Sequence, residues 1–179
     1  MDNVGELMRQ ARRARREGRR DDARRDWSEA VALCRCRASR RGLIEALEGL
    51  AQLDRDLDDD DAARPLYDEA VALCRQEADP LLLAHTLRHL GDLHQDAARL
   101  AEADACYGEA LDLYRADAAT PPLDLANALR PAALLREAQG RHDEARRLWQ
   151  EAKDLYAAAG VREGVAEALA RLARLQDLG

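Results

Sequence analysis

The chain has 179 residues, a length that suits one compact domain or one short array of repeats. Aromatic residues make up 3% of it, phenylalanine is absent, and the helix formers alanine, leucine and arginine are abundant, so we expect an all-α protein without a sheet. Residues 1–41 contain thirteen arginines and seven acidic residues, whereas residues 42–179 contain fifteen basic and twenty-eight acidic residues. The sequence has neither an apolar run of membrane-spanning length nor a secretory signal. We therefore expect a soluble, cytoplasmic protein that does not enter membranes.

The chain is expected to form nine helices. Apolar residues recur three and four positions apart along almost its whole length, which is the spacing of one helix face. Pro80 and Pro122 suit helix starts, the acidic run 58–61 favours another start, and Gly140 and Gly160 mark turns. The predicted helices cover residues 3–17, 21–37, 41–56, 60–77, 80–97, 100–116, 122–139, 142–158 and 162–177.

Every second predicted helix carries the same motif, in which an alanine is followed four residues later by an aromatic residue and, after one further residue of any type, by Glu-Ala. Successive copies are separated by 40, 40 and 42 residues. A further pair of apolar residues follows each copy, so that Cys34 and Cys74 share their repeat position with Tyr114 and Tyr156 and are expected in the core. The motif begins at Ala23, Ala63, Ala103 and Ala145, and its aromatic residues are Trp27, Tyr67, Tyr107 and Trp149.

The intervening helices carry a second recurring pattern. A leucine is followed four residues later by a small residue, as in the pairs Leu47 and Ala51, Leu87 and Gly91, Leu129 and Ala133, and Leu169 and Ala173. Each repeat is therefore a pair of amphipathic helices, and neither helix of a pair can bury its apolar face alone.

The two patterns together resemble tetratricopeptide repeats. The resemblance implies a right-handed α-solenoid of antiparallel helix pairs, forming a single domain over residues 1–179 with repeats at 3–37, 41–77, 80–116 and 122–158 and a capping helix at 162–177. The period exceeds the usual 34 residues and is similar to the long-period variety found in bacterial regulatory arrays. A HEAT-like helix pair could share the 40-residue step, but that family lacks the aromatic-Glu-Ala motif.

The resemblance implies a non-catalytic scaffold that binds a protein or peptide partner, in assembly or regulation, without a cofactor. In the family the first helix of each pair lines the concave face. The positions that hold a chaperone-tail clamp in some members read Met8, Arg12, Gly49, His85 and His89 here, so that ligand is not expected. The residues expected to contact a partner are Glu45, Glu48, Gln52, His85, Arg88, His89, Asp92, Asn127 and Arg130.

An alternative hypothesis is a structural unit that self-associates through its terminal helices. The last predicted helix, 162–177, has no following partner in its pair and carries Leu169, Leu172 and Leu175, with Leu178 just beyond it. Such a helix would either cap the preceding pair or dock on another copy of the chain.

Three further site hypotheses are weaker. The residues His85, His89 and Asp92 have a spacing that could hold a metal, but the Glu of a His-Glu-x-x-His site is absent. The acidic run that starts at Asp54 lacks the glycine and the final glutamate of a calcium loop. The arginine-rich first helix lacks aromatic residues for base stacking, so we expect neither a metal nor a nucleic-acid partner.

Overall fold

The computed structural model describes residues 3–177, and these residues form nine α-helices and no strand. The all-α class predicted from composition is confirmed, and each predicted boundary lies within three residues of the observed one. The helices are α1 (Asn3–Arg16), α2 (Arg20–Cys36), α3 (Arg40–Arg55), α4 (Asp60–Cys74), α5 (Pro80–Asp96), α6 (Leu100–Ala116), α7 (Pro122–Ala138), α8 (His142–Ala158) and α9 (Arg162–Gln176).

Tight turns join most of these helices. In six of the turns within residues 3–177, one residue adopts the left-handed conformation that ends a helix. The turns predicted at Gly140 and Gly160 are among them, with φ values of 71° and 73°. Glycine adopts this conformation without the clash of a Cβ atom, which explains why these two glycines punctuate the last repeats.

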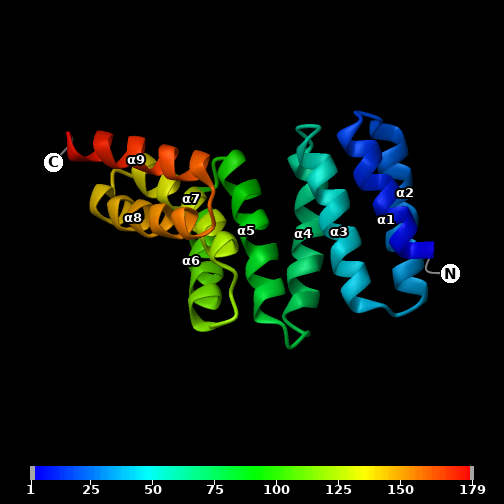
Figure 1. The fold of residues 1–179 in the computed structure, drawn as a ribbon. Coiled ribbons are helices and arrows are strands. Elements are labelled where there is room, and N and C mark those ends of the chain that lie inside the picture. Colours follow the sequence, from blue (N-terminus) through cyan, green and yellow to red (C-terminus); the bar gives the residue numbers. More distant parts are fainter. Residues whose placement is uncertain (1–2, 178–179) are drawn as a thin grey trace. The chain divides into compact units, whose positions relative to one another are not determined.

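The helices group into two compact units, one formed by residues 1–79 and the other by residues 80–179. Within each unit consecutive helices pack against each other as antiparallel pairs (Figure 1). The first helices of neighbouring pairs also touch, α1 with α3 in one unit and α5 with α7 in the other, and we call these helices the inner layer of each unit. The single domain expected over residues 1–179 stays a prediction.

The repeated residues form the core of both units, as the sequence predicted. The motif alanines and the aromatic residues that follow them are almost fully buried, and so are Cys34, Cys74, Tyr114 and Tyr156. The small residues of the first helices let an aromatic ring approach the backbone. A Cβ atom added to Gly91 would lie 2.6 Å from the ring of Tyr107, which belongs to the second helix of the same pair.

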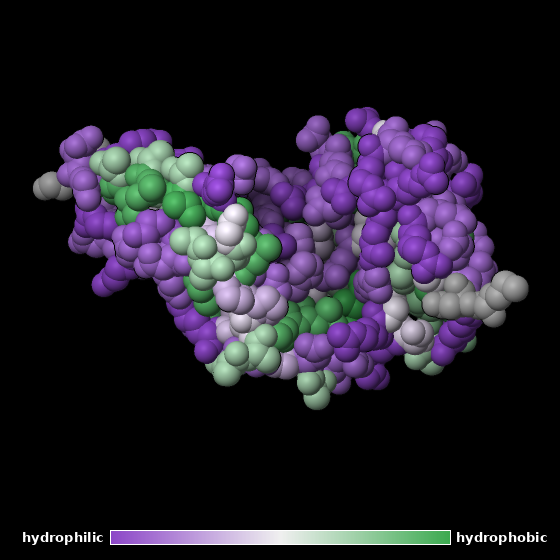
Figure 2. All heavy atoms as spheres, in the orientation of Figure 1, coloured by the Kyte–Doolittle hydropathy of each residue, from purple (hydrophilic) through white to green (hydrophobic). Residues whose placement is uncertain are grey.

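The last helix departs from this pattern. Leu47, Leu87 and Leu129 are buried, but their counterpart Leu169 on α9 is 52% exposed. Ala173 is exposed too, and Figure 2 shows apolar surface among polar atoms in the region of α9. No helix follows α9 within residues 3–177 to cover this face; Leu178, named in the self-association hypothesis, lies outside the described residues.

The contact at Gly91 predicts that a change from glycine to alanine destabilises the protein at Gly91 but stabilises it at Gly108. Gly91→Ala forces a methyl group against Tyr107, whose ring is buried and held by a hydrogen bond to Asp92. The overpacking costs about 1–3 kcal/mol, and the better helix propensity of alanine offsets only about 1 kcal/mol of it. Gly108→Ala meets no atom within 4 Å and should stabilise the protein. Urea denaturation measures both changes, and effects of the same sign would contradict the packing described.

Candidate partner-binding face

Six of the nine predicted contact residues lie on the inner layer of the second unit. The helices α5 and α7 bury Leu87, Leu90 and Leu129 against their neighbours, so the polar residues between these leucines are turned away from the core. We call this set the second-unit inner face, and it consists of His85, Arg88, His89, Asp92, Asn127 and Arg130.

The part of this face on α5 is a connected polar network. The Tyr107 hydroxyl donates a hydrogen bond of 2.8 Å to Oδ1 of Asp92, and Arg88 reaches Oδ2 of the same carboxylate at 3.4 Å. Arg88 also donates to Nε2 of His89 at 2.7 Å. Because a guanidinium can only donate, Nε2 of His89 must be the acceptor. The proton of a neutral His89 ring therefore sits on Nδ1. This nitrogen lies 3.7 Å from Oδ2 of Asp92. The network orients the Arg88 fork before any ligand arrives.

A second histidine extends the network towards the start of α5. The His85 ring meets the His89 ring edge to face, with centroids 4.7 Å apart and planes at 75°. Desolvation by neighbouring atoms lowers the pKa of His85, although the residue keeps exposed surface; the positive charge of Arg88 lowers this pKa further, whereas Asp124 acts in the opposite direction. His85 is therefore neutral at neutral pH and offers a hydrogen-bonding group without a charge.

The two residues on α7 are already engaged by other helices of the unit. Oδ1 of Asn127 accepts a hydrogen bond of 3.1 Å from the Tyr156 hydroxyl on α8, which leaves its amide nitrogen as the donor group. Arg130 forms a two-pronged ion pair with Glu167 on α9, at 2.7 and 2.9 Å. Hydrogen bonding to Glu167 is the main reason why the pKa of Arg130 is raised further.

Sequence reasoning missed these supporting partners. Glu167 occupies the same repeat position as Glu45, and each pairs with an arginine of the preceding first helix, Arg130 or Arg12. The shared position marks the two glutamates as equivalent in the sequence, but it does not say which arginine each of them reaches. Tyr107 and Tyr156 were assigned only to the core, because the pattern of buried residues says nothing about where their hydroxyl groups point.

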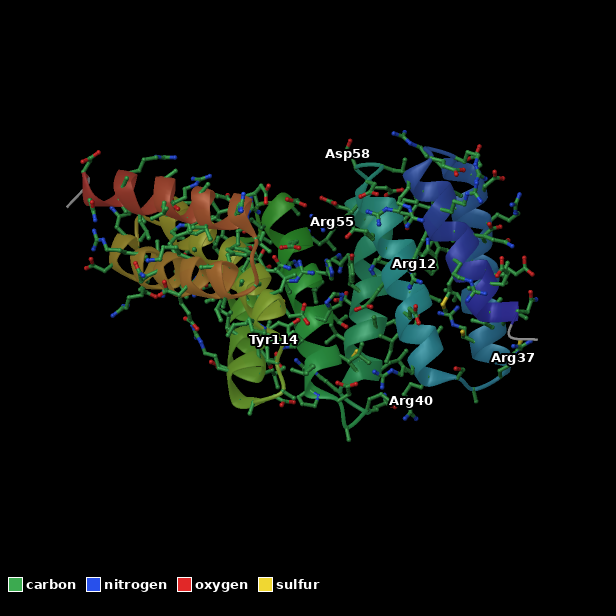
Figure 3. All side chains as sticks on the ribbon, viewed as in Figure 1. Arg12, Arg37, Arg40, Arg55, Asp58 and Tyr114 are labelled. Carbon is green, nitrogen blue, oxygen red and sulfur yellow. The ribbon has the colours of Figure 1, made fainter. Side chains whose placement is uncertain are left out.

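The other three predicted residues lie on α3 in the first unit. Glu45 pairs with Arg12 of α1, which is labelled in Figure 3. The Arg12 guanidinium also lies 5.5 Å from the centre of the Trp27 ring. Gln52 donates to Asp56 at 3.0 Å, and Glu48 is half-buried. Glu45 therefore serves to join α1 to α3 inside the unit.

The weaker site hypotheses find no support in the described part of the chain. Residues 3–177 contain no cluster of three histidine, cysteine or acidic side chains placed to hold a metal ion, and the four cysteines form no disulfide. Arginines of α1 are engaged by nearby carboxylates, Arg13 by Glu17 and Arg15 by Asp56. Among the same residues, none of the helices has the length and apolar character required to cross a bilayer.

Comparison with known proteins agrees with this architecture. The model of the tetratricopeptide repeat family matches residues 42–116, which run from α3 to the end of α6. No curated protein matches the chain in sequence.

Three solved structures show the same fold at low sequence identity. BtubC (BKLC) from P. vanneervenii has a TM-score of 0.78 and 20% identity, and the match covers 88% of this chain but only 64% of that protein. A Podosopora anserina protein described as a kinesin light chain with nearly identical TPR-like repeats has a TM-score of 0.71 and 17% identity, over 98% and 97% of the two chains. MamA has a TM-score of 0.63 and 16% identity, over 98% and 93%.

The structure consists of antiparallel helix pairs, each with a buried motif of alanines and one aromatic residue, and the first helices of the pairs expose polar residues. These features define the class of helical repeat proteins that act as interaction scaffolds. The repeat motif, the family match over residues 42–116 and the shared fold together support a tetratricopeptide repeat protein. Proteins of this fold serve in general as scaffolds for protein interactions.

Proposed function

We propose that this chain is a non-catalytic scaffold that binds an extended or helical peptide of a protein partner along the second-unit inner face. It would act in assembly or regulation, in the cytoplasm and without a cofactor. The observation that carries the proposal is the state of Arg88, which is only 18% exposed, is held by His89 and Asp92, and keeps its planar fork fixed. A fixed fork loses little entropy when it binds a carboxylate.

The chemistry of the face favours a peptide that carries an acidic group. Arg88 supplies donors that match a carboxylate, and the amide nitrogen of Asn127 can donate to a peptide carbonyl. The His85 ring, neutral at neutral pH, offers a further polar contact without adding a charge. Arg130 is held by two short contacts with Glu167, whereas the single contact of Arg88 with Asp92 is 3.4 Å long, so Arg88 is the more available cation for a ligand on this face.

A second candidate function is self-association through α9. The exposed Leu169 favours self-association, because Leu47, Leu87 and Leu129, the leucines at the same repeat position, are all buried. The two functions use different surfaces of the second unit, so one variant can remove either without the other.

The triple variant Arg88→Ala, Asn127→Ala, Arg130→Ala tests the first function. Peptides selected on the wild-type chain from a random display library provide the probe, and their affinity is measured by fluorescence anisotropy. We expect acidic peptides to be enriched and the triple variant to bind them at least about tenfold more weakly, a difference of about 1.4 kcal/mol. Circular dichroism should show unchanged helicity, because none of the three residues belongs to the repeated core.

Arg88→Ala alone is the cleanest variant of the series. Within residues 3–177, Arg88 hydrogen-bonds His89 and Asp92 of its own helix, whereas Asn127 and Arg130 also hold Tyr156 and Glu167 on other helices. The matched control is Arg147→Ala, which removes an exposed arginine of α8 that is not among the predicted contact residues and should bind as the wild type does. Unchanged peptide affinity in the triple variant, or equal losses in the control, would refute the proposal.

A further inference from the structure

The exposed face of α9 is apolar at its centre. Leu169 is the middle residue of this 15-residue helix, and residues three or four positions away lie on the same side of a helix. On one side of Leu169 these are Val165 and Ala166, and on the other side Leu172 and Ala173. Ala166 and Ala173 are exposed, and Val165 and Leu172 are half-buried. Together the five residues form a patch that we call the α9 face.

The α9 face is complementary to itself in size. If a second copy of α9 packs antiparallel across a two-fold axis at Leu169, each residue meets the one equally far on the other side of Leu169. Val165, four positions before, then faces Ala173 of the second copy, and Leu172, three positions after, faces Ala166. Each larger side chain is set against an alanine, and Leu169 meets its own counterpart at the axis. This alternation of large and small residues lets two helices approach closely.

The ends of α9 are complementary to each other in charge. In the same antiparallel arrangement, Glu163 comes opposite Leu175 and so lies one residue from Arg174, and Arg162 comes opposite Gln176, one residue from Asp177, distances that these side chains can span. All four side chains are exposed, and within residues 3–177 no ion pair engages them. A two-fold axis produces each attraction twice. A parallel arrangement would instead bring like charges together, Glu163 against Glu163 and Arg174 against Arg174.

We infer that the α9 face is covered by the α9 face of a second copy of this chain, in an antiparallel two-fold dimer centred on Leu169. The inference rests on the second candidate function and names its partner and its register. One helix face per copy is small compared with a standard interface, so the dimer should dissociate on dilution. The second-unit inner face takes no part in it, because none of its six residues belongs to the α9 face.

Sedimentation velocity measures the oligomeric state from about 1 µM to about 1 mM. The wild-type mass should rise from 19.9 kDa towards twice that value, and Leu169→Glu should stay monomeric throughout. The matched control is Leu100→Glu, which changes another exposed leucine, 39% accessible and on α6, and should dimerise like the wild type. A wild-type chain that stays monomeric would overturn self-association itself. A Leu169→Glu variant that dimerises normally would leave self-association standing but remove it from the α9 face.

Two single charge reversals test the register. Glu163→Arg alone places arginine against arginine twice, and Arg174→Glu alone places glutamate against glutamate twice, so each variant should dimerise about fivefold more weakly than the wild type. A mixture of the two variants forms a heterodimer in which both pairs are attractive again, and it should associate as tightly as the wild type. A mixture no tighter than either variant alone would overturn the antiparallel register, and would favour another helix as the occupant of the α9 face.

Discussion

Trp149→Ala is expected to lower the free energy of unfolding of the second unit by about 3–5 kcal/mol. Trp149 is fully buried, and its indole N–H donates a hydrogen bond of 2.5 Å to Glu137 on α7. Removing the ring leaves a cavity between α7 and α8 and deprives a half-buried carboxylate of its donor. Urea denaturation followed by circular dichroism measures the loss.

Trp27 provides a matched comparison in the first unit. It occupies the same repeat position and is equally buried, but its indole N–H has no hydrogen-bond partner within the described residues. Trp149→Phe loses volume and a hydrogen bond, whereas Trp27→Phe loses volume but keeps an aromatic ring next to Arg12, so Trp149→Phe should cost about 1 kcal/mol more. The chain contains only these two tryptophans, so each variant keeps one, in the unit that was not mutated. The fluorescence of that tryptophan reports the unfolding of the unmutated unit. Its unfolding transition should be unchanged if the two units unfold independently. Equal losses in both variants would show that the Glu137 hydrogen bond contributes nothing.

Ala103→Leu is expected to destabilise the protein by about 1–3 kcal/mol, because three further carbon atoms must enter a packed site. Ala103 is the first residue of the repeated motif on α6 and has no exposed surface. The same change at Ala105, two residues along the helix and exposed, should stay within about 0.5 kcal/mol of the wild type. Thermal melting of the two variants measures the difference, and an Ala103→Leu variant that melts with the wild type would mean that the repeat register is wrong.

The fold followed from the sequence because the repeat is a local signal. Four copies of one motif at a nearly constant step predict four copies of one helix pair, and the spacing of three and four residues predicts which side of each helix is buried. Cys34 and Cys74 show how far this reaches. Their repeat position is shared with Tyr114 and Tyr156, and that was sufficient to place all four in the core.

The candidate site followed only in part. Repeat position assigned His85, Arg88 and Asn127 to the first helices, but it did not predict which hydrogen bonds or ion pairs these side chains form. The pairs that hold the inner layers join residues far apart in the chain, such as Arg130 with Glu167 and Tyr156 with Asn127. Whether two such side chains reach each other depends on the stacking of successive pairs, which no local pattern encodes.

The sequence by itself determined the helices, the period and the core of each pair, because these depend on contacts between residues close in the chain. It assigned Leu169 the same role as Leu47, Leu87 and Leu129, since the four occupy one position of the repeat. Only the tertiary structure decided that three of them are buried and Leu169 is exposed. The physical reason is that a first helix buries its leucine against the second helix of its own pair, and within the described residues α9 has no second helix.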